Sequence, residues 1–186
     1  MERCGERTPG VPDILGPQLD VLFCGINPGA LSGATGHHFA RPGNRFWSAL
    51  HGAGFTDRRL APGEQYELLA AGVGITNLVA RTTATAAEVE PAELRAGAQR
   101  VAAVALRWRP RAVAILGIQA YRQAFGRPHA TIGRQPEPIG PSELWVLPNP
   151  SGLQARYQLP DLIEMLSALR ASVRPEGGAR RPPPPA

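Results

Sequence analysis

Short apolar runs alternate with amphipathic stretches along most of the chain. Four of the apolar runs are too short for a helix and predict strands at residues 21–26, 74–79, 112–116 and 144–147. The stretches between and after them predict helices at residues 44–53, 64–71, 91–108, 119–125 and 161–171. This alternation indicates an α/β fold with a parallel central sheet.

The helix predicted at residues 91–108 has the clearest pattern. Its apolar residues recur at three- and four-residue steps, at Leu94, Ala98, Val101, Ala105 and Trp108. Pro91 fits the first turn, where a backbone N–H has no partner in any case. The spacing therefore predicts one long helix between the second and third strands.

Similar motifs follow the first and the last predicted strands. "GINPG" occupies residues 25–29 and "LPNPSG" occupies residues 147–152. In a parallel sheet, ligands gather beyond the carboxyl ends of the strands. We therefore expect the two motifs to lie in one cleft.

The length of 186 residues suits one domain, which we place at residues 13–173. Residues 1–12 are polar and rich in turn formers, so we expect a flexible N-terminus. Residues 174–186, "RPEGGARRPPPPA", have almost nothing to bury and predict a disordered tail. Its arginines could touch DNA without sequence preference, although a solvated tail with no role is the favoured interpretation.

The apolar runs and the cysteine count bear on the compartment. No apolar stretch approaches the roughly eighteen residues of a membrane span, and the N-terminus lacks the apolar segment of an export signal. The two cysteines, Cys4 and Cys24, are too few for a four-thiolate zinc site or an iron–sulfur cluster. We expect a cytoplasmic protein that does not contact a membrane.

Every one of the twenty basic residues is arginine. The absence of lysine excludes a Walker-type phosphate loop and any Schiff base on a lysine amine. The net charge of +5 and the pI near 10.2 fit a polyanionic partner such as nucleic acid. A biased coding composition would explain the lysine deficit equally well.

The chemistry available at "GINPG" is that of a neutral amide. No Asp or Glu occurs between Val21 and Thr56, so Asn27 is the only polar side chain that the first strand end offers. An amide is a poor base, but it can orient a water toward a centre that becomes cationic as its leaving group departs. Cleavage of an N-glycosidic bond has this character. Taken alone, the motif could equally be a strand-to-helix turn capped by asparagine.

Five motifs together carry a resemblance to a known family. They are "FCGINPG", "GHHFARPGNRFW", "GITNLVARTT", "AILGIQAY" and "WVLPNPSGL". Between about residues 13 and 170 the chain resembles the mismatch-specific uracil-DNA glycosylases and thymine-DNA glycosylases of the uracil-DNA glycosylase superfamily. The resemblance implies a three-layer α/β/α fold with a short, mostly parallel sheet.

The resemblance also implies a function. It predicts a monofunctional, monomeric glycosylase of the bacterial nucleoid that needs neither cofactor nor metal. Its partner would be double-stranded DNA with a base flipped out opposite guanine. The enzyme would excise uracil, or also thymine or ethenocytosine, and leave an abasic site for base excision repair. A superfamily member specialised for another damaged base, or a catalytically silent DNA-binding module, are the alternatives.

Individual roles follow from the matched motifs. Asn27 would position the hydrolytic water, and Phe39 would stack on the flipped base. Asn149 would donate to the base oxygen that gains charge as the bond breaks. The turn after it would enter the duplex, with Leu153 as the wedge; this turn comprises Gly152, Leu153, Gln154, Ala155 and Arg156.

Further base contacts are implied by the resemblance. Backbone amides at Ile26, Gly29 and Phe39 would supply hydrogen bonds. Ser32 and His38 would face the 5-position of the base; Ser32 resembles the uracil-preferring branch, whereas His38 resembles the thymine-active branch. Asn77 also resembles the thymine-active branch, but it could equally be a satisfied buried amide.

The roles of several charged residues stay open at this point. Arg156 comes one residue later than in bacterial relatives and could read guanine or grip phosphate. Arg41 has the same ambiguity, and for Arg45 a surface or phosphate role is favoured. Glu88 or Glu90 could assist catalysis, but exposure on the surface is favoured for both.

Overall fold

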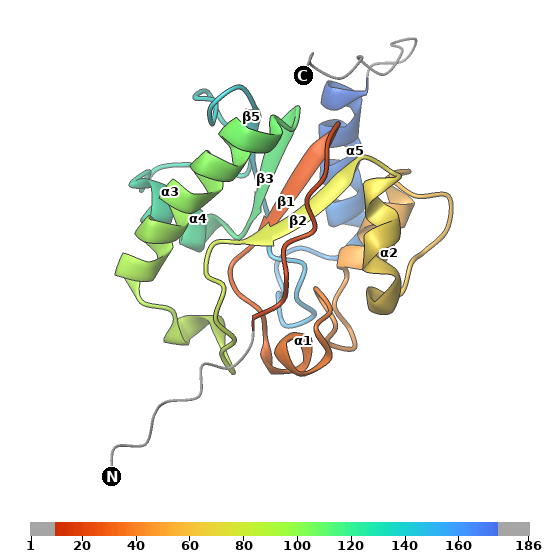
Figure 1. The fold of residues 1–186 in the computed structure, drawn as a ribbon, viewed down its shortest axis with the longest axis horizontal. Coiled ribbons are helices and arrows are strands. Elements are labelled where there is room, and N and C mark those ends of the chain that lie inside the picture. The colour runs from red at the N-terminus through yellow and green to blue at the C-terminus, as the bar shows by residue number, and fades with distance from the viewer. Residues whose placement is uncertain (1–9, 175–186) are drawn as a thin grey trace.

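The computed structural model describes residues 10–174 and contains one five-stranded sheet with the order β2-β1-β3-β5-β4 (Figure 1). Its four long strands are β1 (Val21–Gly25), β2 (Val73–Asn77), β3 (Ala112–Leu116) and β5 (Glu143–Leu147). These strands pair in parallel, and the two-residue β4 (Gly133–Arg134) pairs antiparallel with β5 at the edge. The sheet is therefore mostly parallel.

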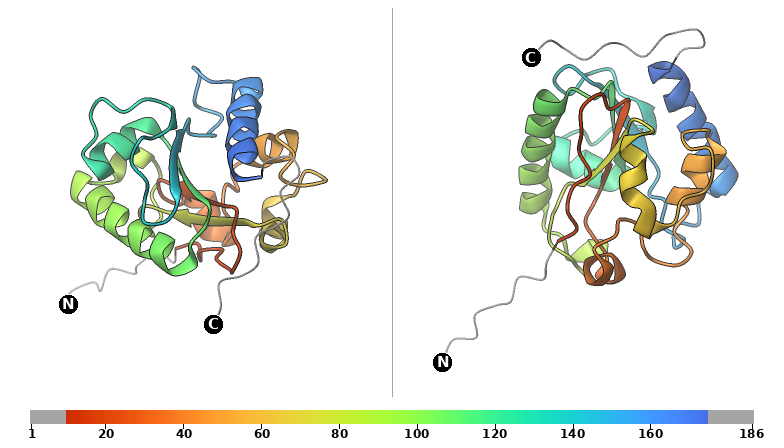
Figure 2. Two further views of the ribbon diagram at one scale, coloured as in Figure 1. Left: turned by 90° about the horizontal axis from the view of Figure 1, so that it is seen from above. Right: turned by 45° about the vertical axis from the view of Figure 1, so that its right-hand side comes forward.

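Helices cover both faces of the sheet (Figures 1 and 2). One face carries α2 (Phe46–Gly52), α5 (Leu159–Val173) and the 3₁₀ helix η1 (Pro62–Leu69). The other face carries α3 (Pro91–Trp108) and α4 (Ile118–Phe125). This arrangement confirms the predicted three-layer α/β/α fold.

The alternation of side chains along β1 builds two separate cores. Val21 and Phe23 point into the core under α2 and α5, whereas Leu22 and Cys24 point into the core under α3 and α4. Phe23 meets the ring of Phe46 edge-on, with the centroids 5.4 Å apart. Because both faces of β1 are buried, its sequence is a continuous apolar run rather than an alternating one.

Most predicted elements agree with the structure. The predictions at 91–108 and 112–116 have the observed bounds of α3 and β3, and the other three strands differ by one or two residues at their ends. The helix predicted at residues 64–71 is observed two residues earlier, at residues 62–69, and it is the 3₁₀ helix η1 rather than an α-helix. Its buried residues Gln65 and Leu68 are three positions apart, which fits three residues per turn.

Three short elements were not predicted. The helix α1 (Ala30–Thr35) has six residues, of which Ser32 alone is buried, so it shows no apolar periodicity. The 3₁₀ turn η2 (Ala86–Glu88) buries none of its residues, and β4 is too short for any pattern. Elements that bury few side chains leave little hydrophobic signal in a sequence.

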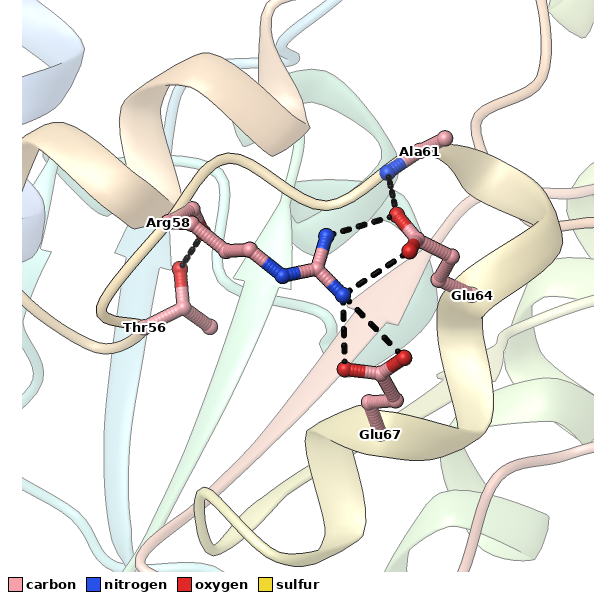
Figure 3. A network of polar contacts seen from close by, with 5 residues as sticks. All are labelled: Thr56, Arg58, Ala61, Glu64 and Glu67. Atoms are coloured by element: carbon pink, nitrogen blue, oxygen red, sulfur yellow. Dashed lines mark hydrogen bonds and ion pairs between the residues drawn. The ribbon is translucent and has the colours of Figure 1, made fainter.

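An ion-pair network fixes the start of η1 (Figure 3). The guanidinium of Arg58 bonds both Glu64 and Glu67, and Glu64 also accepts a hydrogen bond from the backbone N–H of Ala61. The hydrogen bonds from Arg58 and Ala61 lower the pKa of Glu64 to about 2. The network lies in solvent, so its role is to set local geometry rather than to supply much stability.

The chain termini are described only in part. Residues 1–9 and 175–186, which hold most of the predicted flexible N-terminus and disordered tail, lie outside the described residues. Val11 is buried, and Arg174 pairs with Asp20 at 2.7 Å. Within residues 10–174, no helix is both long and apolar enough to cross a membrane.

Candidate active site

A cavity of about 700 Å³ lies beyond the carboxyl ends of the four parallel strands. Its lining includes Gly25 at the end of β1, Asn77 at the end of β2 and Leu116 at the end of β3. The chain leaves β1 toward β2 on one side and returns to β3 on the other, so the cavity opens at the topological switch point. "GINPG" lines it, and so do the first three residues of "NPSG", so the two motifs share one cleft, as predicted.

The cavity gathers most of the residues that the sequence nominates. Nine of them line it: Ile26, Asn27, Gly29, Ser32, His38, Phe39, Asn77, Asn149 and Leu153. Four others do not: Gly152, Gln154, Ala155 and Arg156. These four belong to the exposed turn beside Leu153, outside the cavity itself.

The side chain of Asn27 is held by its nitrogen. Nδ2 donates to Oγ1 of Thr83 at 2.6 Å and to the backbone oxygen of Pro28 at 3.1 Å. Oγ1 of Thr83 in turn donates to the backbone oxygen of Thr85 at 2.7 Å. Because the nitrogen is committed, Oδ1 remains as an acceptor that could hold a water.

Thr83 is a site residue that the sequence analysis missed. It is buried, it lines the cavity, and its own backbone N–H donates to Pro28 at 3.1 Å. The available signal was its place in the "ARTT" segment that follows β2. A threonine in a loop gives no indication of its partner until the fold brings residues 27 and 83 together.

Asn149 is held by the opposite amide atom. Its Oδ1 accepts a hydrogen bond from the backbone N–H of Ser151 at 2.9 Å, a local turn that uses the side-chain oxygen. The Nδ2 group therefore remains as a neutral donor at the cavity wall. The two asparagines thus offer the cavity one acceptor and one donor.

Phe39 is supported on a second aromatic ring. It stacks on Phe46 with ring centroids 4.2 Å apart and an interplanar angle of 27°. Its backbone is in the left-handed region, with φ of 51°, a conformation that costs a non-glycine residue about 1 kcal/mol or more. The packing on α2 holds the ring in the cavity lining despite this cost.

His38 is buried, and both of its ring nitrogens have polar partners. Its Nε2 lies 2.8 Å from the backbone oxygen of Pro12, and its Nδ1 lies 3.4 Å from Nδ2 of Asn77. Burial lowers the pKa of His38 below its ordinary value of 6.5. In the tautomer whose Nε2–H donates to Pro12, Nδ1 can accept a hydrogen bond from Nδ2 of Asn77. Asn77 is therefore both a residue of the cavity lining and a buried amide with a hydrogen-bond partner.

A partly exposed hydrogen-bond network contacts the backbone of Asn77. Arg100 donates to Asp13 at 2.9 Å and to Oγ1 of Thr76 at 2.9 Å, and it also contacts the backbone oxygen of Asn77. Gly25 is required opposite this side chain, because a Cβ there would lie 2.4 Å from Oδ1 of Asn77. The end of β2 is therefore fixed from two directions.

Ser32 and Gly29 shape the wall formed by α1. The Ser32 side chain is buried, and its Oγ accepts from the backbone N–H of Ala40 at 3.2 Å. Gly29 is the N-cap residue of α1, in an extended conformation with φ of −75° and ψ of 170°. Both residues line the cavity, so the start of α1 forms part of the cavity wall.

The cavity lining contains no carboxylate among the described residues, and Arg41 is its one residue that is charged at neutral pH. Glu88 is exposed and accepts from the backbone N–H of Thr85, and Glu90 is also exposed. Neither lines the cavity, which confirms the surface position favoured for both. Within residues 10–174, no cluster of three or more His, Cys, Asp or Glu residues could hold a metal ion.

The turn after Asn149 projects its apolar residue into solvent. Leu153 is 73 % exposed, although it borders the cavity. The guanidinium of Arg156 lies over the ring of Tyr157, 5.5 Å from its centroid, and away from the cavity lining. Arg45, for which a surface or phosphate role was favoured, is instead half-buried beneath this turn.

Two comparisons with known proteins show the family and the fold of the chain. The family described as the uracil DNA glycosylase superfamily matches residues 12–170. The fold is also similar to the solution NMR structure of a candidate uracil DNA glycosylase from Methanosarcina acetivorans. That similarity has a TM-score of 0.56 and 17 % sequence identity, and it covers 88 % of this chain and 98 % of the other.

Proposed function

Because the chain belongs to the uracil DNA glycosylase superfamily, we propose that it excises uracil from guanine mismatches in double-stranded DNA by hydrolysis. Family membership supports the general role of a DNA glycosylase. The preference for guanine mismatches rests on the motifs around Asn27 and Asn149. The single observation that carries the proposal is the cavity lined by both asparagines and by Phe39, with no carboxylate among residues 10–174 of its lining.

The two asparagines fit the two charges that develop as an N-glycosidic bond breaks. The bonding electrons leave with the base, which becomes an anion, and the sugar becomes oxocarbenium-like. Nδ2 of Asn149 can donate to the oxygen of the departing base. Oδ1 of Asn27 can hold the water that adds to the anomeric carbon and then releases its proton to solvent.

Selection of mismatches would come from the cost of flipping the base. A base in a mismatch is already weakly paired, so it costs less to extrude into the cavity. Phe39 provides a supported ring on which the base can stack, and Leu153 can fill the gap left in the duplex. Without lysine, no strand-cutting step through a lysine Schiff base follows, and the product is an intact abasic site.

Single-turnover release of the base tests the proposal. Duplexes with one G:U, G:T, A:U or G:ethenocytosine pair are incubated with excess protein, and alkali then cleaves the abasic sites. We expect G:U to react well above A:U, and the G:T lane decides whether thymine is also a substrate. Asn27→Ala should bind the same duplexes but release little base. Binding without release in every lane, with the wild-type protein, would contradict the proposal.

A further inference from the structure

Arg45 lies directly beneath the turn that carries Leu153. Its Nη2 donates to the backbone oxygens of Ser151 at 2.6 Å and Gln154 at 2.7 Å. Its Nη1 donates to the backbone oxygen of Tyr157 at 2.7 Å and to Oε1 of Gln158 at 3.3 Å. One guanidinium therefore connects both ends and the middle of the segment 151–158.

These contacts join parts of the segment whose other hydrogen bonds are local, within two or three residues. The segment precedes α5 and belongs to no strand, and its internal backbone bonds include one from Gln154 to Ser151 at 3.0 Å. Among residues 10–174, the four acceptors of Arg45 are neutral oxygens, and no carboxylate forms an ion pair with it. Hydrogen bonds from a charged donor are shorter and stronger than neutral ones. The N–H groups of a planar guanidinium are arranged as a fork, which can bond several acceptors at once.

Arg45 is itself fixed to the rigid part of the fold. Its backbone N–H donates to Pro150 at 2.9 Å, and Phe46, the next residue, is buried in the core under α2. Gly152 packs against the backbone just before Arg45, since a Cβ on Gly152 would be 2.7 Å from the backbone oxygen of Gly43. The exposed turn is thus attached to the core through residues 43–46.

We propose that Arg45 is a positioning residue that holds the segment 151–158 in the conformation that presents Leu153 to the DNA duplex. This inference rests on the proposed function. It adds Arg45 as a residue that would affect base excision by holding Leu153, the proposed wedge, in place. Without the guanidinium, the turn would have to be ordered each time Leu153 enters the duplex, and that conformational entropy would oppose flipping. Excision from single-stranded DNA needs no wedge and should not depend on Arg45.

The test compares Arg45→Ala and Arg45→Lys on duplex G:U and on single-stranded uracil substrates, under single-turnover conditions. We expect Arg45→Ala to slow duplex excision by about tenfold or more, with single-stranded excision little changed. Arg45→Lys keeps the charge but loses the fork, so it should recover only part of the duplex rate. Arg122→Ala is the matched control, because Arg122 bonds the backbone oxygen of Ala130 in a loop outside the cavity lining. Equal losses on both substrates would overturn the proposal.

A double mutant separates action through Leu153 from general damage. If Arg45 acts through the wedge, Arg45→Ala added to Leu153→Ala should slow duplex excision little beyond Leu153→Ala alone. Independent, multiplied losses would overturn the positioning role.

Hydrogen exchange provides a readout that needs no enzyme activity. In Arg45→Ala, amides of the segment 151–158 should exchange faster, whereas those of β1 and β3 should keep their protection. Faster exchange throughout the protein, or unchanged exchange in the segment, would overturn the proposal. Because this result does not depend on base release, a failure of the proposed function would be seen separately in the wild-type excision assay.

Discussion

The two asparagines of the cavity have the same side chain but offer it opposite atoms. Asn27 is bonded through its nitrogen to Thr83, whereas Asn149 is bonded through its oxygen to Ser151. An amide can accept through its oxygen or donate through its nitrogen, so Thr83 and Ser151 decide whether each asparagine offers the cavity an acceptor or a donor. Substitutions that alter one amide atom at a time can therefore test the assignment.

Asn149→Asp and Asn149→Ala distinguish the Nδ2 donor of Asn149 from the hydrogen bond that its Oδ1 forms in the local turn. The aspartate keeps an oxygen for the backbone N–H of Ser151 but removes the donor and adds a negative charge beside the departing anion. We expect both variants to slow single-turnover excision by about a hundredfold or more, with Asn149→Asp at least as slow as Asn149→Ala. Near wild-type excision by Asn149→Asp would show that the turn, and not the donor, is what the reaction uses.

His38 gives the stability of the protein a pH dependence of definite sign. Its pKa is lowered by burial, so the unfolded chain binds this proton more readily than the folded one. The free energy of unfolding should therefore fall as the pH drops below the ordinary value of 6.5, and the loss should be complete below the folded pKa. Above that range His38 should contribute no pH dependence.

Chemical denaturation of wild type and His38→Gln between pH 5 and 8 measures this effect. The difference in unfolding free energy between the two proteins should change with pH only in the acidic half of this range. A difference that is constant with pH would mean that burial does not keep this imidazole neutral.

At the scale of elements, the exposed turn between β5 and α5 combines two features that rarely occur together. Leu153 is among the most exposed large apolar residues of the described chain, yet the backbone that carries it is held by Arg45. An exposed apolar side chain on a supported backbone suits insertion into another molecule better than packing within the protein's own core.

Leu153→Ala should therefore reduce excision from paired DNA far more than excision from single-stranded DNA. The physical reason is that, as the proposed wedge, the leucine would fill the space left by the flipped base, and single strands leave no such space. We expect a duplex loss of about tenfold or more with thermal unfolding unchanged, because the side chain is exposed. Equal losses on the two substrates would remove the wedge role.

Long, well-buried elements were predictable from the sequence, and the short ones around the site were not. The helix α3 and the strand β3 bury a regular face or a continuous run, so their bounds follow from hydrophobicity. The small helix α1, which carries Ser32, has no such pattern. Nine of the residues nominated by the motifs line the cavity, whereas Thr83 and Arg45 bond to partners that are distant in sequence.

At the scale of the whole molecule, charge is separated from the reaction site. The chain carries a net charge of +5, yet the cavity lining holds one arginine and no carboxylate among the described residues. Attraction to phosphate must therefore come mainly from arginines outside the cavity, whereas the proposed chemistry depends on neutral groups. Binding and base release should then respond differently to salt.

Raising the salt concentration should weaken DNA binding while leaving the rate of base release at saturating protein almost unchanged. Each phosphate contact releases counterions, so the logarithm of the binding constant should fall with the logarithm of salt by about 0.9 per contact on duplex DNA. The proposed release step would use Asn27 and Asn149, which are neutral and lie in the cavity lining, so salt should have little effect on it. Titrations of a G:U duplex at several salt concentrations, each followed by single-turnover release at saturation, measure both quantities. A release rate that falls as steeply as the affinity would show that charged groups take part in the chemical step, and the neutral mechanism would have to be abandoned.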